Sequence, residues 1–224
     1  MQDAAIARRV IPPHEIHFQC MVHLESETII GYEALARFAD GRSPQDHLTE
    51  AVHADQLVEL ELALLRSAVI AAEAIPPEYA VTLNASAETI DSPVLETLLP
   101  TGRLWGIELA ETSRPESDDR LRRRTHDLGV LLLIDDAGSA NATTEWVNVL
   151  HPDIVKMDRR LIQTACYDAA AHRELDLFLE TARAIGATTV AEGVETEEHV
   201  QLARTAGIDY AQGWHFGRPA PYAA

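Results

Sequence analysis

Two adjacent carboxylates, Asp135 and Asp136, follow directly after the apolar run Val130–Ile134. This run is too short for most helices and rich in branched side chains, so it predicts a buried strand that delivers both aspartates to an open edge. Neighbouring carboxylates repel each other unless positive charge lies beside them, and a divalent cation with oxygen ligands commonly supplies it. For the pair taken alone, a cap on the following helix is the competing interpretation.

Polar side chains also stand at or near the ends of other predicted strands. They are Glu33, Asn84, Glu108, Lys156, Glu192 and Gln212. In a barrel of parallel strands such residues converge on one face, and carboxylate and amide oxygens suit Mg²⁺ or Mn²⁺ rather than zinc. A single polar strand end is usually only solvated. So many inward carboxylates, however, would raise one another's pKa and cost stability unless cations neutralised them, which favours a functional site.

Eight short strands are needed to position these residues. The predicted strands are Ile16–His23, Thr28–Glu33, Tyr79–Asn84, Leu104–Leu109, Val130–Ile134, Asp153–Met157, Ala187–Ala191 and Ile208–Ala211. The first two are separated by Leu24–Glu27 alone, which is too short for a parallel crossover and predicts an antiparallel hairpin. Predicted helices, at 45–75, 115–128, 142–150, 159–185 and 196–206, separate most of the later strands. This alternation predicts a TIM-like (β/α)8 barrel with the first strand antiparallel to the rest.

The composition limits the partners and location that we expect. The chain of 224 residues has no linker-like stretch, so we expect a single domain over 1–224, with 1–15 as an N-terminal extension. Its net charge of −18 argues against DNA, RNA or an anionic membrane as a partner. The two cysteines, Cys20 and Cys166, fit a reduced compartment, and we find no signal peptide or membrane span. We therefore expect a cytoplasmic protein.

Six ordered motifs resemble the EAL domain, the cyclic di-GMP phosphodiesterase family of bacterial signalling. The motifs are GYEALARF (Gly31–Phe38), VTLNAS (Val81–Ser86), IELAE (Ile107–Glu111), IDD (Ile134–Asp136) with PDIVKMD (Pro152–Asp158), VAEGVET (Val190–Thr196) and AQGWHFGRP (Ala211–Pro219). The resemblance covers the chain from Phe18 to Pro219. It implies metal-assisted hydrolysis of cyclic di-GMP to linear pGpG by an enzyme that forms a homodimer.

The resemblance also implies a role for each matching residue. Glu33, Asn84, Glu108 and Asp135 would bind one Mg²⁺ or Mn²⁺ ion, and Asp135 with Asp136 would hold a second. A metal pair can activate a bridging water near neutral pH. Lys156 would orient this water or stabilise charge in the transition state, and Glu192 would act as general base or assist the second metal. Gln212 would complete this shell, while Gln19, Arg37 and Glu195 would contact or position the substrate.

One segment departs from the family pattern. Where the family has DDFGTG, this chain reads DDAGSA, with Ala137 and Ala140 replacing an aromatic residue and a glycine. In the family this loop links the metal site to the dimer interface, and Glu111 would stabilise it. Loss of the aromatic anchor and the glycine predicts an altered catalytic rate or dimerisation.

Three functions therefore compete. The first is a working phosphodiesterase, favoured by the complete ligand set. The second is a catalytically weak or inactive receptor for cyclic di-GMP, favoured by the altered loop. The third is a protein-interaction module that no longer binds the nucleotide, which the retained polar residues disfavour.

Overall fold

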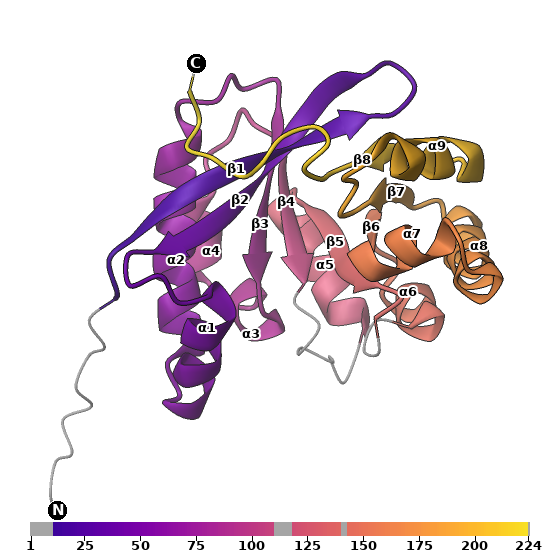
Figure 1. Ribbon diagram of the computed structural model, residues 1–224. Coiled ribbons are helices and arrows are strands. Elements are labelled where there is room, and N and C mark those ends of the chain that lie inside the picture. Colours follow the sequence, from indigo (N-terminus) through magenta and orange to yellow (C-terminus); the bar gives the residue numbers. More distant parts are fainter. Residues whose placement is uncertain (1–10, 110–117, 140–142, 224) are drawn as a thin grey trace, which may run out of the picture.

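The computed structural model describes residues 11–109, 118–139 and 143–223, and its strands close into a barrel in the order β1 to β8 (Figure 1). The strands are β1 (His14–His23), β2 (Thr28–Phe38), β3 (Ala80–Ala85), β4 (Trp105–Leu109), β5 (Leu131–Ala137), β6 (Ile154–Met157), β7 (Thr188–Ala191) and β8 (Tyr210–Ala211). β1 runs antiparallel to both of its neighbours, β2 and β8, and the other neighbouring pairs are parallel. This confirms the predicted TIM-like barrel with its antiparallel first strand.

Helices surround the barrel in the described part of the chain (Figure 1). They are α1 (Pro44–His53), α2 (Leu57–Ala72), α3 (Ala87–Ile90), α4 (Val94–Leu98), α5 (Asp118–Leu128), α6 (Thr144–Leu150), α7 (Arg159–Ala165), α8 (Ala169–Ile185) and α9 (Glu197–Ala206). The predicted helical stretches at 45–75 and 159–185 each form two helices. The predicted starts of the stretches at 115–128 and 142–150 lie outside the described residues.

The β1–β2 hairpin is longer than the sequence predicted. β1 begins at His14, two residues before the predicted start, and β2 continues five residues beyond Glu33 to Phe38. The reason is their pairing, because antiparallel register holds the two strands together from His23 with Thr28 to His14 with Phe38. Glu27 adopts a left-handed φ of 56° in the turn between the strands.

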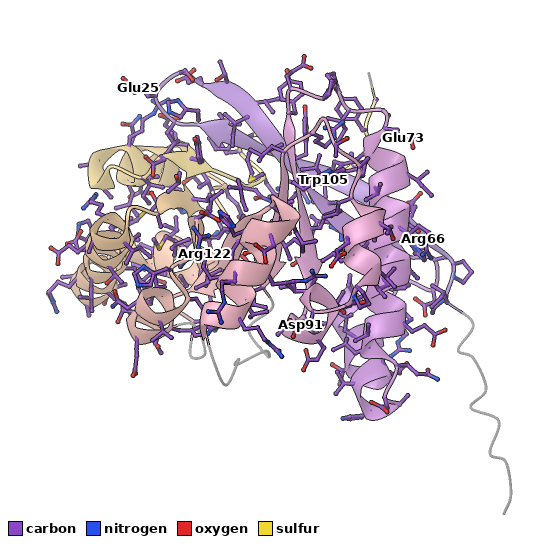
Figure 2. The ribbon with its side chains drawn as sticks, turned by 180° about the vertical axis from the view of Figure 1, so that it is seen from behind. Glu25, Arg66, Glu73, Asp91, Trp105 and Arg122 are labelled. Atoms are coloured by element: carbon purple, nitrogen blue, oxygen red, sulfur yellow. The ribbon has the colours of Figure 1, made fainter. Side chains whose placement is uncertain are left out.

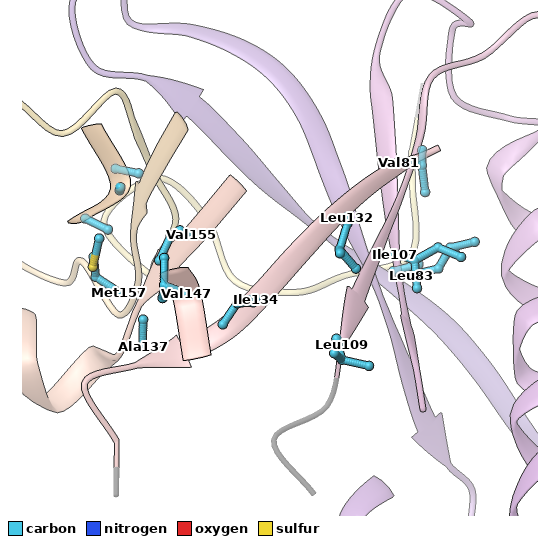
Figure 3. Packing of buried hydrophobic residues seen from close by; sticks show 14 of the residues in the cluster. Val81, Leu83, Ile107, Leu109, Leu132, Ile134, Ala137, Val147, Val155 and Met157 are labelled. Atoms are coloured by element: carbon cyan, nitrogen blue, oxygen red, sulfur yellow. The ribbon is translucent and has the colours of Figure 1, made fainter. Parts of the chain in front are cut away.

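Side chains along each strand point alternately toward the helices and into the barrel interior. The outward side chains of β3, β4 and β5 are apolar and buried under the helices (Figure 3). They include Val81, Leu83, Ile107, Leu109, Leu132 and Ile134. Because successive side chains point to opposite faces, the residues between them point into the barrel. The helix-facing core therefore leaves the inward positions free to carry polar groups.

The end of the chain also packs on β1. Phe18 and Ala220 exchange two backbone hydrogen bonds, of 2.7 and 3.1 Å, and form an antiparallel bridge. Among the described residues, no helix combines the length and apolarity required to cross a membrane. The domain extent of 1–224 and the cytoplasmic location stay predictions.

Candidate active site and metal centre

Lys156 lies at the centre of the polar residues predicted from the sequence. Its side chain is fully buried. The ammonium Nζ lies near one carboxylate oxygen from each of four residues, which lie on or just after β2, β4, β5 and β7. The distances are 2.6 Å to Glu108, 2.7 Å to Glu192, 3.2 Å to Asp135 and 3.5 Å to Glu33. One ammonium group thus faces four carboxyl groups, and we call these five residues the acidic layer. The layer has an excess of negative charge.

Two neutral amide side chains donate hydrogen bonds to Glu33, a member of the acidic layer. Asn84 Nδ2 donates to Glu33 Oε1 at 3.1 Å, and Gln212 Nε2 donates to Glu33 Oε2 at 2.5 Å. Gln212 Nε2 also donates to Gln19 Oε1 at 3.2 Å, while Gln19 Nε2 donates to the carbonyl of Gly217 at 3.0 Å. The register explains part of this arrangement, because Gln19 pairs with Glu33 across β1 and β2. Side chains from both ends of the sequence therefore meet here.

Burial and like charge raise the pKa values of two carboxyl groups in this layer. Burial and the charges of Glu33 and Asp135 raise the pKa of Glu108 to about 8, although Lys156 opposes the shift. Burial and the charge of Asp135 likewise raise the pKa of Glu192 well above its usual value. For Lys156, burial lowers the pKa, but the four surrounding carboxylates outweigh it and hold the pKa well above its usual range. These shifts reflect a shortage of positive charge.

Three carboxylate groups form a site with the dimensions of a cation site. Ligand oxygens of Asp135, Asp136 and Glu192 all lie within 4.8 Å of one another. In a regular strand Asp135 and Asp136 would point to opposite faces. Here the β5–β6 register shifts between Ile134 and Ala137, and Asp136 has a left-handed φ of 52°. This irregularity allows adjacent aspartates to share one site.

Two buried oxygens provide an independent test of whether a cation fits. Glu108 Oε1 and Gln212 Oε1 accept no hydrogen bond from the part of the chain that the structure describes. Buried acceptors without a donor are costly, and a hard cation satisfies carboxylate and amide oxygens together. The donor set contains oxygen ligands and no thiolate, which suits Mg²⁺, Mn²⁺ or Ca²⁺. The residues present therefore fit a metal of this class.

Beside the acidic layer lies a cavity of about 380 Å³. Glu33, Asn84, Asp135 and Asp136 line its polar side. Apolar side chains of β2, α1 and α2 line the other side, and they include Leu35, Leu48, Leu64 and Leu65. A ligand here would contact a charged wall and an apolar wall at once.

Two sequence-predicted residues, Arg37 and Glu195, lie apart from the acidic layer. Arg37 lies four residues beyond Glu33 on β2, and its Nη1 donates to the carbonyl of Ala36 at 2.8 Å. Glu195 is paired with Arg159, whose Nη2 lies 2.6 Å from Glu195 Oε1. Glu111 lies outside the described residues, as does Ala140. The predicted roles of these residues stay predictions.

Glu61 on α2 is a residue that sequence reasoning missed. Its buried carboxylate accepts hydrogen bonds from the Ser86 backbone N–H at 3.0 Å and the Ser86 hydroxyl at 2.6 Å. Ser86 caps α3 and follows Asn84 by two residues, so Glu61 fixes the chain where it leaves β3, just after Asn84. Burial raises the pKa of Glu61, and the hydrogen bonds from Ser86 oppose this in part. Its position four residues after Leu57 and four before Leu65, on one helix face, was the available signal.

Comparison with known proteins identifies the family. The family model described as the EAL domain matches residues 13–219. The chain belongs to the EAL domain family. The EAL chain is 27% identical over 238 residues to the probable cyclic di-GMP phosphodiesterase PdeG of Escherichia coli, covering 97% of this chain and 47% of PdeG. It thus spans less than half the length of that relative.

Solved structures share the fold of the EAL chain. An EAL domain protein from Listeria monocytogenes has a TM-score of 0.80 at 26% identity, covering 93% of this chain and 89% of that protein. Klebsiella pneumoniae BlrP1, in a complex with manganese and cyclic di-GMP, has a TM-score of 0.81 at 24% identity, covering 96% of this chain and 58% of BlrP1. At this identity the likeness to BlrP1 shows the fold alone.

Proposed function

We propose that the EAL chain is a metal-dependent phosphodiesterase that hydrolyses cyclic di-GMP to linear pGpG. The observation that carries this proposal is the acidic layer, in which four carboxyl groups surround a single buried ammonium. Family membership and the phosphodiesterase name of PdeG support it.

The metal ligands in this proposal are those that the sequence suggested. Glu33, Asn84, Glu108 and Asp135 would hold one Mg²⁺ or Mn²⁺, and Asp135 with Asp136 would hold the second. When bound, such ions supply a water of lowered pKa and neutralise charge on the phosphodiester. The acidic layer and the undonated oxygen of Glu108 support this assignment.

The protein side chains would then position the reactants and move the proton. In hydrolysis the water oxygen forms a bond to phosphorus, the bond from phosphorus to the 3′ oxygen of ribose breaks, and that oxygen takes up a proton. A carboxylate oxygen of Glu192 is proposed to accept the proton of the water, a role that its position beside Asp135 and Asp136 supports. Lys156 Nζ holds the carboxylates together and stabilises the charge that develops. Gln212 and Gln19 position Glu33 through the amide contacts.

The direct test incubates purified protein with cyclic di-GMP and Mn²⁺ or Mg²⁺ and separates pGpG from the cyclic substrate. Glu33→Gln should lower turnover by about 100-fold or more, because it removes a charged metal ligand. Glu25→Gln is the matched control, since Glu25 is exposed in the β1–β2 hairpin (Figure 2). Intact cyclic di-GMP after incubation with folded protein and metal would refute the phosphodiesterase proposal.

The altered loop supports a second candidate, a receptor that binds cyclic di-GMP with little or no turnover. Ala137 is fully buried and pairs with Met157, so the aromatic residue expected in the family is replaced inside the core next to Asp135 and Asp136. A receptor would bind cyclic di-GMP in calorimetry with Ca²⁺ and release no pGpG with Mn²⁺. The homodimer also stays a prediction. It is tied to the choice between enzyme and receptor, because the altered loop at Asp135–Ala140 was expected to affect dimerisation as well as turnover.

A further inference from the structure

Arg218 carries a positive charge that no carboxylate neutralises in the part of the chain that the structure describes. The residue is exposed, and its guanidinium carbon lies 3.7 Å from the centroid of the Trp214 ring. Other surface arginines, such as Arg42, Arg122 and Arg124, are each paired with a carboxylate. Such pairing is expected in a chain with 36 acidic and 18 basic residues. The charge of Arg218 is therefore available to an anionic ligand.

Trp214 holds the guanidinium of Arg218 by its flat face, and we call these two residues the stacked pair. A separation of 3.7 Å is that of a stacked cation–π contact. Stacking uses the face of the guanidinium and leaves its N–H groups, which point outward in its plane, free to donate. Because the ring already restrains the side chain, less conformational entropy is lost when an anion binds. The stacked pair thus presents a preoriented fork that can bind a phosphate through two hydrogen bonds.

The stacked pair belongs to the segment after β8, which is joined to the acidic layer at two points. Gln212, at the start of this segment, donates to Glu33 at 2.5 Å. The carbonyl of Gly217 accepts a hydrogen bond from Gln19 at 3.0 Å, and Gln19 accepts one from Gln212 at 3.2 Å. One member of the pair follows Gln212 by two residues, and the other follows Gly217 directly. The free charge therefore stands at the rim of the acidic layer.

A second arginine beside the stacked pair is already neutralised. The Arg159 guanidinium carbon lies 5.5 Å from the centroid of the same indole ring, but its Nη2 lies 2.6 Å from Glu195 Oε1. Arg159 follows Lys156 by three residues, and Glu195 follows Glu192 by three, so both stand just beyond the acidic layer. They place the indole ring at the same rim from two further strands. The charge in this group that can serve an anion is that of the stacked pair.

The proposed substrate has one phosphate more than the metals would bind. Cyclic di-GMP carries two phosphates in one ring, and hydrolysis opens the phosphodiester that the metals polarise. The second phosphate then lies close by, with its negative charge near a layer of four carboxyl groups. A cation at the rim would offset this repulsion.

We propose that Arg218, held in place by Trp214, binds the second phosphate of cyclic di-GMP, the one that is not hydrolysed. This inference rests on the proposed function, because it assigns a further contact to the same substrate. Trp214 is a positioning residue, since it contacts Arg218 and acts on the phosphate through it.

Two guanine dinucleotides test the contact. Cyclic di-GMP has two phosphates, whereas linear GpG has the same two guanines and a single phosphate, which is expected at the metals. The purified chain is titrated with each by calorimetry in Ca²⁺, and chromatography checks that the ligand stays intact. Arg218→Met should weaken cyclic di-GMP by about tenfold and GpG by much less, because it removes a charge-assisted contact to the second phosphate. Arg66→Met removes the same charge from the exposed face of α2 (Figure 2) and should bind both ligands as the wild type does.

Variants of Trp214 test the positioning role. Trp214 is 46% exposed, so its replacement leaves the core intact. Trp214→Leu should weaken cyclic di-GMP by about threefold, and Trp214→Phe should restore the affinity, because a phenyl ring also stacks on a guanidinium. Added to Arg218→Met, Trp214→Leu should have little further effect, since both act through one contact.

Three outcomes would overturn this inference. Equal losses for cyclic di-GMP and GpG in Arg218→Met would mean that Arg218 does not read the second phosphate. Wild-type affinity in Arg218→Met, with a loss in Arg37→Met, would assign this phosphate to Arg37. Additive losses in the double variant would remove the positioning role of Trp214. In all three the wild type still binds cyclic di-GMP and the proposed function stands, whereas a wild type that binds no cyclic di-GMP would refute both proposals.

Discussion

The two ends of the barrel interior are built by the same strands but have opposite chemistry. At the carboxyl ends of β4, β6 and β7 stand Glu108, Lys156 and Glu192. Two residues earlier on the same strands stand Gly106, Ile154 and Val190. The first set is charged and ion-paired, and the second is apolar or lacks a side chain.

This difference shows how one fold separates stability from chemistry. The outward faces of the strands carry the apolar residues that pack against the helices (Figure 3). The inward faces can then vary along their length, because a two-residue step keeps the same face and changes only the depth. The polar end holds excess negative charge that a cation would neutralise. The other end contains a cavity and the buried Thr82 hydroxyl, which has no hydrogen-bond partner among the described residues. Substitutions at the two ends should therefore have different consequences.

The largest effect is expected from Lys156→Met. Removing the buried ammonium leaves four neighbouring carboxyl groups without their shared partner. Loss of one member of a buried ion pair typically costs about 3–5 kcal/mol, and the metal-free protein should lose unfolding free energy on that order in urea. Added Mn²⁺ should recover part of the loss, because a ligand of the folded state stabilises it.

Arg42→Met is the matched control for Lys156→Met. Arg42 pairs with Glu50 at 2.5 Å, but both side chains are about half exposed, so solvent screens the pair. Its unfolding curve should stay close to that of the wild type. Equal curves for Lys156→Met and Arg42→Met would contradict the central role of the buried ammonium.

A smaller effect is expected from Asp136→Asn on metal binding. Asparagine tolerates the left-handed backbone of Asp136 but removes one charge from the site formed with Asp135 and Glu192. Because affinity depends on the number of charged ligands, Mn²⁺ binding should weaken about tenfold, as measured from free Mn²⁺ by electron paramagnetic resonance. Asp55→Asn is the control, since Asp55 has a φ of 56° in an exposed turn. Similar Mn²⁺ affinities in the two variants would exclude Asp136 as a ligand.

The sequence predicted the barrel and the polar end because both leave periodic signals. Short apolar runs between helical stretches indicate the strands, and a polar residue after each run indicates the face where they meet. The position of Asp136 depends on the register shift between Ile134 and Ala137 in β5, which the residue types in this stretch do not predict. Glu61 joins the site through Ser86, across 25 residues, and its role appears only when α2 packs on β3. The tight packing of Thr82 and Leu133 against Gly106 likewise depends on the three-dimensional fit of side chains from different strands.

Glu61→Gln should change the pH dependence of stability. The pKa of Glu61 is raised above its ordinary value of 4.5, so the folded state holds the proton more tightly than the unfolded chain. The wild type should therefore lose stability relative to Glu61→Gln as the pH rises from the ordinary value through the raised one. Urea unfolding of the metal-free proteins at a series of pH values from about 4 upward measures this difference. Glu59→Gln, on the exposed side of α2, should follow the wild type at every pH, and a Glu61→Gln curve parallel to it would refute the prediction.

The smallest effect is expected from Thr82→Val in the absence of any ligand, and its sign is opposite to that of Lys156→Met. Within the part of the chain that the structure describes, the Thr82 hydroxyl has no hydrogen-bond partner. Valine keeps the shape of threonine and replaces this hydroxyl by a methyl group, so the variant should be about 1 kcal/mol more stable. For a chain of this size such a gain raises Tm by about 2–4 °C in a calorimetric scan. Thr181→Val removes a hydroxyl that is bonded to the Leu177 carbonyl, and it should gain less. A lower Tm for Thr82→Val would contradict this prediction. It would mean that Oγ1 is already hydrogen-bonded in solution, so that the amino end of the barrel also contains a satisfied polar group.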